Sequence, residues 1–144
     1  MLFRSTLRRK GNNGYGWGYP YTWQARSFRF PPNTPTAVAS SFAVDALFHA
    51  FEITGNEVYK ATALETATVV LEDLHRTPYK NGFMFSYSQY EGNNTVYNAS
   101  LLAARILLQC YKYTNIVEYL TTAKTAIDTC VNDQAEDGIR DVHV

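Results

Sequence analysis

The stretch NASLLAARILLQC, residues 98–110, carries apolar side chains at the spacing of an α-helix. Its apolar residues follow one another at intervals of three, one, three, one and three positions. They are Ala99, Leu102, Ala103, Ile106, Leu107 and Cys110. This spacing places them on one face of a helix, so we expect a helix that follows Asn98 and stops near Asn115.

The same pattern occurs 60 residues earlier, which indicates an internal repeat. The matched pairs are Phe42 and Leu102, Ala43 and Ala103, Leu47 and Leu107, Ala50 and Cys110, Phe51 and Tyr111, Thr54 and Thr114, Tyr59 and Tyr119, Ala63 and Ala123, and Val70 and Cys130. One helical hairpin cannot bury its apolar face alone, so neighbouring hairpins must stack. The repeat therefore predicts an all-α fold of two antiparallel helical hairpins, forming one domain over residues 35–144.

Capping residues place the helices of the first hairpin. The first is expected from about Thr36 to Gly55, with Thr34 as N-cap and Pro35 at the first helical position. Its expected buried stripe is Val38, Phe42, Ala46, Ala50 and Ile53. Asn56 is expected to cap the second helix, which runs to about His75. The last helix is expected from about Val117 to Asn132.

Two segments lack the helical period. Residues 1–34 are rich in glycine and proline, and we expect an irregular, aromatic N-terminal segment there. Residues 83–87 alternate in the manner of a strand, and turn residues at 91–94 precede residues 95–97. We expect residues 83–87 and 95–97 to pair as a small β-hairpin inserted between the helical hairpins.

Bulk composition excludes some classes of protein. The 144 residues carry no net charge, which argues against nucleic-acid binding. No apolar run approaches the roughly 18 residues of a membrane span. Cys110 and Cys130 should lie several helical turns apart, so reduced thiols and a cytoplasmic location are expected. The three histidines lack metal-ligand spacing, so neither a metal nor a cofactor is expected.

Several tracts resemble one family of α/α-toroid proteins. They are WGYPYTWQARSFRFPPNTPTAVAS (17–40), AFEITGNEVY (50–59), NGFMFSYS (81–88), NASLLAARIL (98–107) and NDQAEDG (132–138). The family is encoded among bacterial polysaccharide-biosynthesis genes and is related to the six-hairpin glycosidases and squalene-cyclase-like proteins. The resemblance implies a partial α/α toroid, and the chain looks like an internal piece of a longer protein.

Some members of that family carry the label delta-aminolevulinic acid dehydratase. That chemistry resembles a barrel of alternating strands and helices with Schiff-base lysines, which this sequence does not show. We therefore do not expect dehydratase activity.

Aromatic and polar residues near the N-terminus form the best candidate ligand site. Aromatic rings stack on the apolar faces of sugars, while amide and guanidinium groups bond to hydroxyls or a carboxylate. The candidate binding residues are Trp17, Tyr19, Trp23, Gln24, Arg26, Tyr87 and Asn98. Because the loops that carry them both precede the first helix of a hairpin, we expect them at the same end of the stack. Sealing of the bundle end by the rings is the alternative role.

Catalytic candidates are weaker. Glycoside cleavage needs two carboxylates that face each other across the bond. Glu91, in the expected turn, and Asp137, before Gly138, are the loop carboxylates considered. Asp45 lies mid-helix and matches Arg105 in the repeat, so an ion pair between hairpins is the simpler interpretation and a catalytic role the alternative.

The predicted function is carbohydrate-related: glycan binding in the synthesis or processing of bacterial surface polysaccharide. A structural or interaction module, and a glycoside hydrolase or polysaccharide lyase, are the alternatives. The expected partner is a glycan or polysaccharide precursor. An exposed apolar flank is further expected to pair with a second copy or with further hairpins of a longer chain.

Overall fold

A computed structural model describes residues 8–26 and 28–141, together with the side chains as far as Asp133. The helices are α2 (Ala37–Thr54), α3 (Glu57–Leu64), α4 (Thr66–Thr68), the π-helical turn η1 (Val69–Asp73), α5 (Tyr97–Thr114) and α6 (Val117–Asp141). Three two-stranded antiparallel sheets accompany them in the described residues. The expectation of an all-α toroid is therefore wrong, because the chain combines helices with β-hairpins.

The strands form the hairpins β1 (Arg8–Lys10) with β2 (Tyr15–Trp17), β3 (Trp23–Gln24) with β4 (Arg29–Phe30), and β5 (Arg76–Tyr79) with β6 (Gly82–Phe85). The first two lie in the segment expected to be irregular. The expected pairing of residues 83–87 with 95–97 is also wrong, since β6 pairs with β5, which precedes it. A tight turn at Lys80, whose φ is +45°, makes that pairing local.

Helix ends follow local capping chemistry. Gly55, with φ +67°, ends α2, and the Asn56 side chain accepts a hydrogen bond from Val58 N, as predicted. The N-cap of α2 is Thr36, whose side chain accepts from Ala39 N. Thr34 instead donates its hydroxyl to Pro31 O, so the predicted cap was two residues too early.

The buried face of α2 differs from the predicted stripe. The fully buried residues are Ala37, Ser40, Ser41, Val44 and Phe48. Phe42 and Ile53, which were expected in the core, are 63% and 84% exposed. The reason is tertiary: β2 and α5 pack on the serine and Phe48 side of α2 and leave the other side uncovered.

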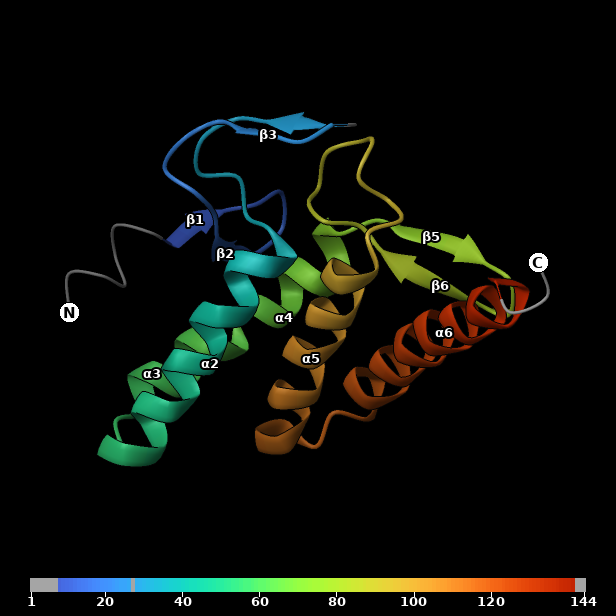
Figure 1. Cartoon of the computed structure of the whole chain (residues 1–144). Helices are drawn as coiled ribbons and strands as arrows, with labels where there is room; N and C mark the ends of the chain where they lie inside the picture. Colours follow the sequence, from blue (N-terminus) through green and yellow to red (C-terminus); the bar gives the residue numbers. More distant parts are fainter. Residues whose placement is uncertain (1–7, 27, 142–144) are drawn as a thin grey trace.

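Two units of similar build follow one another, and Figure 1 shows their long helices α2 and α5 side by side. Each unit is a β-hairpin followed by a helix pair: β1–β2 with α2–α3, and β5–β6 with α5–α6. In each, a serine in the first turn of the long helix accepts a hydrogen bond from the end of the hairpin. Trp17 N donates to Ser40 Oγ and Phe85 N donates to Ser100 Oγ, both at 3.0 Å.

A buried aspartate also holds the hairpin turn in each unit. Asp73, at the end of η1, accepts a hydrogen bond from Asn13 N at 2.7 Å. Asp133, 60 residues later in α6, accepts from the Tyr79 hydroxyl at 2.8 Å and from the Lys80 ammonium at 2.7 Å. The same position of the second helix therefore braces the hairpin in both units.

The hairpins are offset by 68 residues rather than 60. GYGWGY at residues 14–19 aligns with GFMFSY at residues 82–87. Sixteen residues separate Tyr19 from Thr36, and eight separate Tyr87 from Val96. The extra residues of the first unit form the β3–β4 hairpin, which lies beyond the N-terminal end of α2 (Figure 1).

Among the described residues, α2 is long and apolar enough to cross a bilayer, although core helices of soluble proteins pass the same test. This is weak evidence for a membrane span, and the sequence-based expectation that there is none stays a prediction.

Candidate functional site

Six aromatic side chains, one exposed and the others half-buried or buried, gather around the β3–β4 hairpin. The aromatic cluster consists of Tyr19, Tyr21, Trp23, Phe28, Phe30 and Tyr87. The segment after β6 reaches the same end of the molecule, where Tyr87 O accepts from Ala37 N at 2.9 Å and Ser88 bridges Thr36. The predicted placement of the two loops at one end is confirmed.

Three rings form the outer layer of the aromatic cluster. Tyr19 stacks on Tyr21, with centroids 5.7 Å apart, and on Trp23, with centroids 4.9 Å apart, while Tyr21 and Trp23 lie 6.5 Å from each other, so the three rings form a triangle. Tyr21 is 53% exposed, whereas Tyr19 and Trp23 are half-buried. These rings therefore present a contiguous aromatic surface to solvent.

The inner layer joins the hairpin to the second unit. Phe28 and Phe30 stack on each other at 5.7 Å, and each contacts the Tyr87 ring. Burial raises the pKa of the Tyr87 phenol, and a hydrogen bond to Tyr19 raises it further. Since Tyr19 and Tyr87 occupy equivalent positions of the two units, the cluster spans the join between them.

The opposite face of the hairpin is polar. Register pairs Trp23 with Phe30 on one face and Gln24 with Arg29 on the other. Gln24 donates its side-chain amide to Ala25 O at 2.8 Å, so this amide already serves the hairpin turn. Arg26 and Arg29 are exposed and form no ion pair with the residues that the structure describes. A surface hollow of about 300 Å³ adjoins Arg29, between Thr22 and the prolines 31–32.

Three predicted ligand residues are placed differently from expectation. Trp17 is only 4% exposed and packs in the core, so it has the sealing role and offers no free ring face. Tyr87 is 8% exposed, so its ring packs in the inner layer against Phe28 and Phe30 and is not available to a ligand. Asn98 is exposed in the first turn of α5, and no contact joins it to the aromatic cluster in the described part of the chain.

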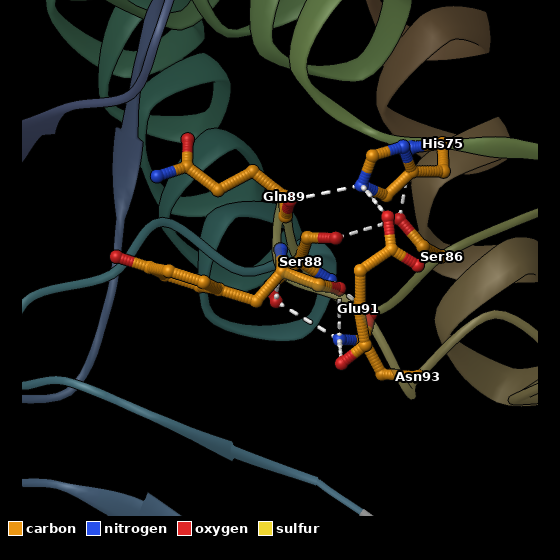
Figure 2. Close-up of polar contacts among 7 residues, drawn as sticks. His75, Ser86, Ser88, Gln89, Glu91 and Asn93 are labelled. Atoms are coloured by element: carbon orange, nitrogen blue, oxygen red, sulfur yellow. Dashed lines mark hydrogen bonds and ion pairs between the residues drawn. The ribbon is translucent and has the colours of Figure 1, made fainter.

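The segment from Ser86 to Asn93 is held by its own polar contacts, which Figure 2 shows. Asn93 is 1% exposed, accepts from Ser88 N at 2.9 Å and donates to the carbonyl of Tyr90. This loop therefore has a fixed shape beside the aromatic cluster.

His75 approaches the same loop from the end of the first unit. Its Nε2 lies 2.8 Å from Gln89 O, and a carbonyl can only accept, so Nε2 carries the proton. Glu91 Oε1 lies 3.7 Å from the same nitrogen, and Figure 2 shows both side chains on one side of the loop. Because Glu91 is 84% exposed at its side chain, this contact lies at the surface and contributes little stability.

The carboxylates considered for catalysis are not gathered into one site. Glu91 contacts His75, whereas Asp45 lies on α2 and accepts from Arg105 and Gln109 at 2.7 and 2.8 Å. The predicted ion pair between Asp45 and Arg105 is thus confirmed. The side chain of Asp137 lies outside the described residues.

Sequence reasoning missed Tyr21, Phe28 and Phe30 as members of the cluster. Their signal was the occurrence of an aromatic residue at every second position along 19–23 and 28–30, which Pro20 and the prolines 31–32 obscured. Comparison of the chain with known protein families, curated proteins and solved structures finds no match. The resemblance to polysaccharide-locus proteins therefore stays a prediction from the sequence.

Proposed function

We propose that this protein binds a glycan on the outer rings of the aromatic cluster, Tyr19, Tyr21 and Trp23. The observation that carries most weight is the stack of these rings, of which Tyr21 is the most exposed. Pyranose rings present apolar C–H faces that match aromatic faces in size and polarity. A role in bacterial surface-polysaccharide synthesis or processing rests on the sequence resemblance alone.

The β3–β4 hairpin also offers two exposed cations to a ligand that extends past the rings. Arg29 lies on the hairpin face opposite Trp23, and neither Arg26 nor Arg29 forms an ion pair with a described residue. A guanidinium donates in a fixed fork to paired hydroxyls or to a carboxylate. Binding is proposed without turnover, because the two described candidate carboxylates, Asp45 and Glu91, lie in separate places.

Glycan-array binding followed by isothermal titration of the best oligosaccharide tests this function. Tyr21→Ala should weaken binding about tenfold, the effect of losing roughly 1.4 kcal/mol of ring contact. Trp23→Ala should weaken it more, although Trp23 also packs on the core. Tyr21 is exposed, so its variant should keep the wild-type stability.

Tyr15→Ala is the matched control, because Tyr15 is an exposed ring on β2 that is not part of the aromatic cluster. Its affinity should equal that of the wild type. Equal affinities for the wild type and Tyr21→Ala would exclude the outer rings as the binding surface, and absence of any glycan ligand would exclude the function.

A further inference from the structure

The uncovered side of α2 is apolar along its length. Phe42 and Ile53 are 63% and 84% exposed, and Ala46 and His49 lie exposed between them. These positions recur every three or four residues, so they form one stripe on the helix. Large exposed apolar side chains in one stripe mark an interaction surface rather than scattered surface residues.

The second unit shows what covers this stripe when a neighbour is present. The residues of α5 that correspond to Phe42, Ala46, His49 and Ile53 are Leu102, Ile106, Gln109 and Tyr113. All of these are at least half-buried, and Ile106 is 0% exposed, because α5 has the first unit packed beside it. By analogy, the stripe on α2 is the surface that a unit placed before the first one would cover.

Charged pairs set the register of the existing contact. Arg105 donates to Asp45 and Lys112 donates to Glu52, each at 2.7 Å and each joining positions 60 residues apart. Equivalent positions thus meet at equal heights on parallel helices. The aromatic stack of Phe48 on Tyr113, with centroids 4.5 Å apart, lies between the two pairs.

The outer sides of these pairs are complementary in charge. If a second copy places its α2 against α5 in the way that α2 and α5 pack within one chain, Arg105 of the first copy meets Asp45 of the second, and Lys112 meets Glu52. Arg105 and Lys112 are 43% and 65% exposed at their side chains, so both can reach a second acid.

The acids have room for a second cation. Both contacts to Asp45 end on Oδ1, and both contacts to Glu52 end on Oε1. No described residue bonds to the remaining oxygen of either carboxylate. Each acid can therefore bridge the lysine or arginine of its own chain and that of a second copy.

We propose that the exposed stripe of α2 binds the outer side of α5 from a second copy of this chain, in the register that joins α2 to α5 within one chain. The exposed Val131 of α6 would then take the place that Leu71 has in the first unit. The contact joins two different surfaces, so it is heterologous and builds a ring or a filament rather than a two-fold dimer.

Sedimentation equilibrium over a range of concentrations tests the association. The wild-type protein should exceed the mass of one chain as concentration rises. Ile53→Asp should raise the dissociation constant at least about tenfold, since it places a charge on the most exposed apolar residue of the stripe. Val117→Asp, at another exposed apolar residue, 63% exposed at the start of α6, is the matched control and should associate like the wild type.

Mixing two variants tests the heterologous geometry. Ile53→Asp blocks the α2 surface and Val131→Asp blocks the opposite one, so each alone should be monomeric and their mixture should form a one-to-one dimer. Both residues are exposed, and circular dichroism should show unchanged helix content.

Three outcomes would overturn the inference. The first is a wild-type mass of one chain at every concentration, which would leave the stripe to another partner. The second is association that Ile53→Asp does not weaken, or a mixture that stays monomeric. The third is flotation of monomeric protein with phosphatidylcholine vesicles that Ile53→Asp abolishes, which would assign the stripe to a membrane.

Discussion

At the scale of single residues, the two buried aspartates show how equivalent positions take different partners. Asp73 meets backbone and amide N–H groups of the first hairpin turn, whereas Asp133 meets Lys80 and the hydroxyls of Tyr79 and Tyr97. Hydrogen bonds from Lys80 and then from the tyrosines lower the pKa of Asp133 to about 2. The charged form of this carboxylate is therefore favoured by folding.

This lowered pKa predicts a particular dependence of stability on pH. The folded value lies below the unfolded value of 3.8, so the stabilisation is complete above that value and is lost as pH falls toward 2. Asp133→Asn should lower the urea midpoint at pH 7 and make stability less sensitive to acid below pH 4, as measured by urea unfolding at several pH values. Asp128→Asn, at an exposed residue of the same helix, should follow the wild-type curve. Parallel curves for Asp133→Asn and the wild type would contradict the assigned cause.

At the scale of elements, the hairpin turn of the first unit packs closely against η1. A methyl group added at Gly14 would lie 2.8 Å from the backbone N of Val69 and 3.0 Å from the Thr68 side chain. Only glycine allows this approach, which lets Gly14 N reach Asp73.

Gly14→Ala should therefore destabilise the protein by roughly 1–3 kcal/mol, because backbone atoms must move apart. Urea unfolding followed by circular dichroism measures the change. Asn12→Ala, at an exposed residue of the same turn, should change stability by less than about 0.5 kcal/mol. If the two variants are equally stable, the turn must be able to move away from η1 at no cost.

Three helix boundaries could be predicted from the sequence, whereas the N-cap of α2, the end of α6 at Asp141 instead of near Asn132, and the buried face of α2 could not. Gly55, Asn56 and Asn115 cap helices through contacts within a few residues, so local chemistry decides them. The face of α2 depends on which elements pack against it, and Phe42 looks as apolar as Phe48. Part of the aromatic site was predicted, since Tyr19 and Trp23 were identified. Trp17 was wrongly placed at the surface, because its position depends on packing against α2, where its backbone N bonds to Ser40, 23 residues away.

At the scale of the whole molecule, the error in fold class came from the hairpins. Their strands are two to four residues long, and glycines 14, 16 and 18 make the first of them resemble a loop. The alignment of residues 14–19 with 82–87 was present in the sequence, and it would have shown that a hairpin precedes each helix pair. The helices repeat after 60 residues, whereas the hairpins repeat after 68 because the β3–β4 insertion lies between the first hairpin and α2. The helix repeat therefore does not align the two hairpins.

The cysteines provide a measurement of global opening. Cys110 and Cys130 are both 0% exposed and unpaired with each other, and burial raises the pKa of the Cys110 thiol to about 12. Neither thiol should react with a disulfide reagent in the native protein, and both should react at one common rate in denaturant. Rapid labelling of either cysteine in native buffer would show that α5 and α6 separate locally.

The β3–β4 hairpin is an insertion between β2 and α2 that the second unit does not have. The two units share the hairpin, the serine bridge and the aspartate brace, and the first has eight more residues between Tyr19 and Thr36 than the second has between Tyr87 and Val96. The connection between hairpin and helix can therefore be longer while the serine still bonds to the end of the hairpin. The equivalent connection after Tyr87 is a position where a second copy of residues 20–34 can be grafted, and under the proposed glycan binding such a variant should bind bivalently.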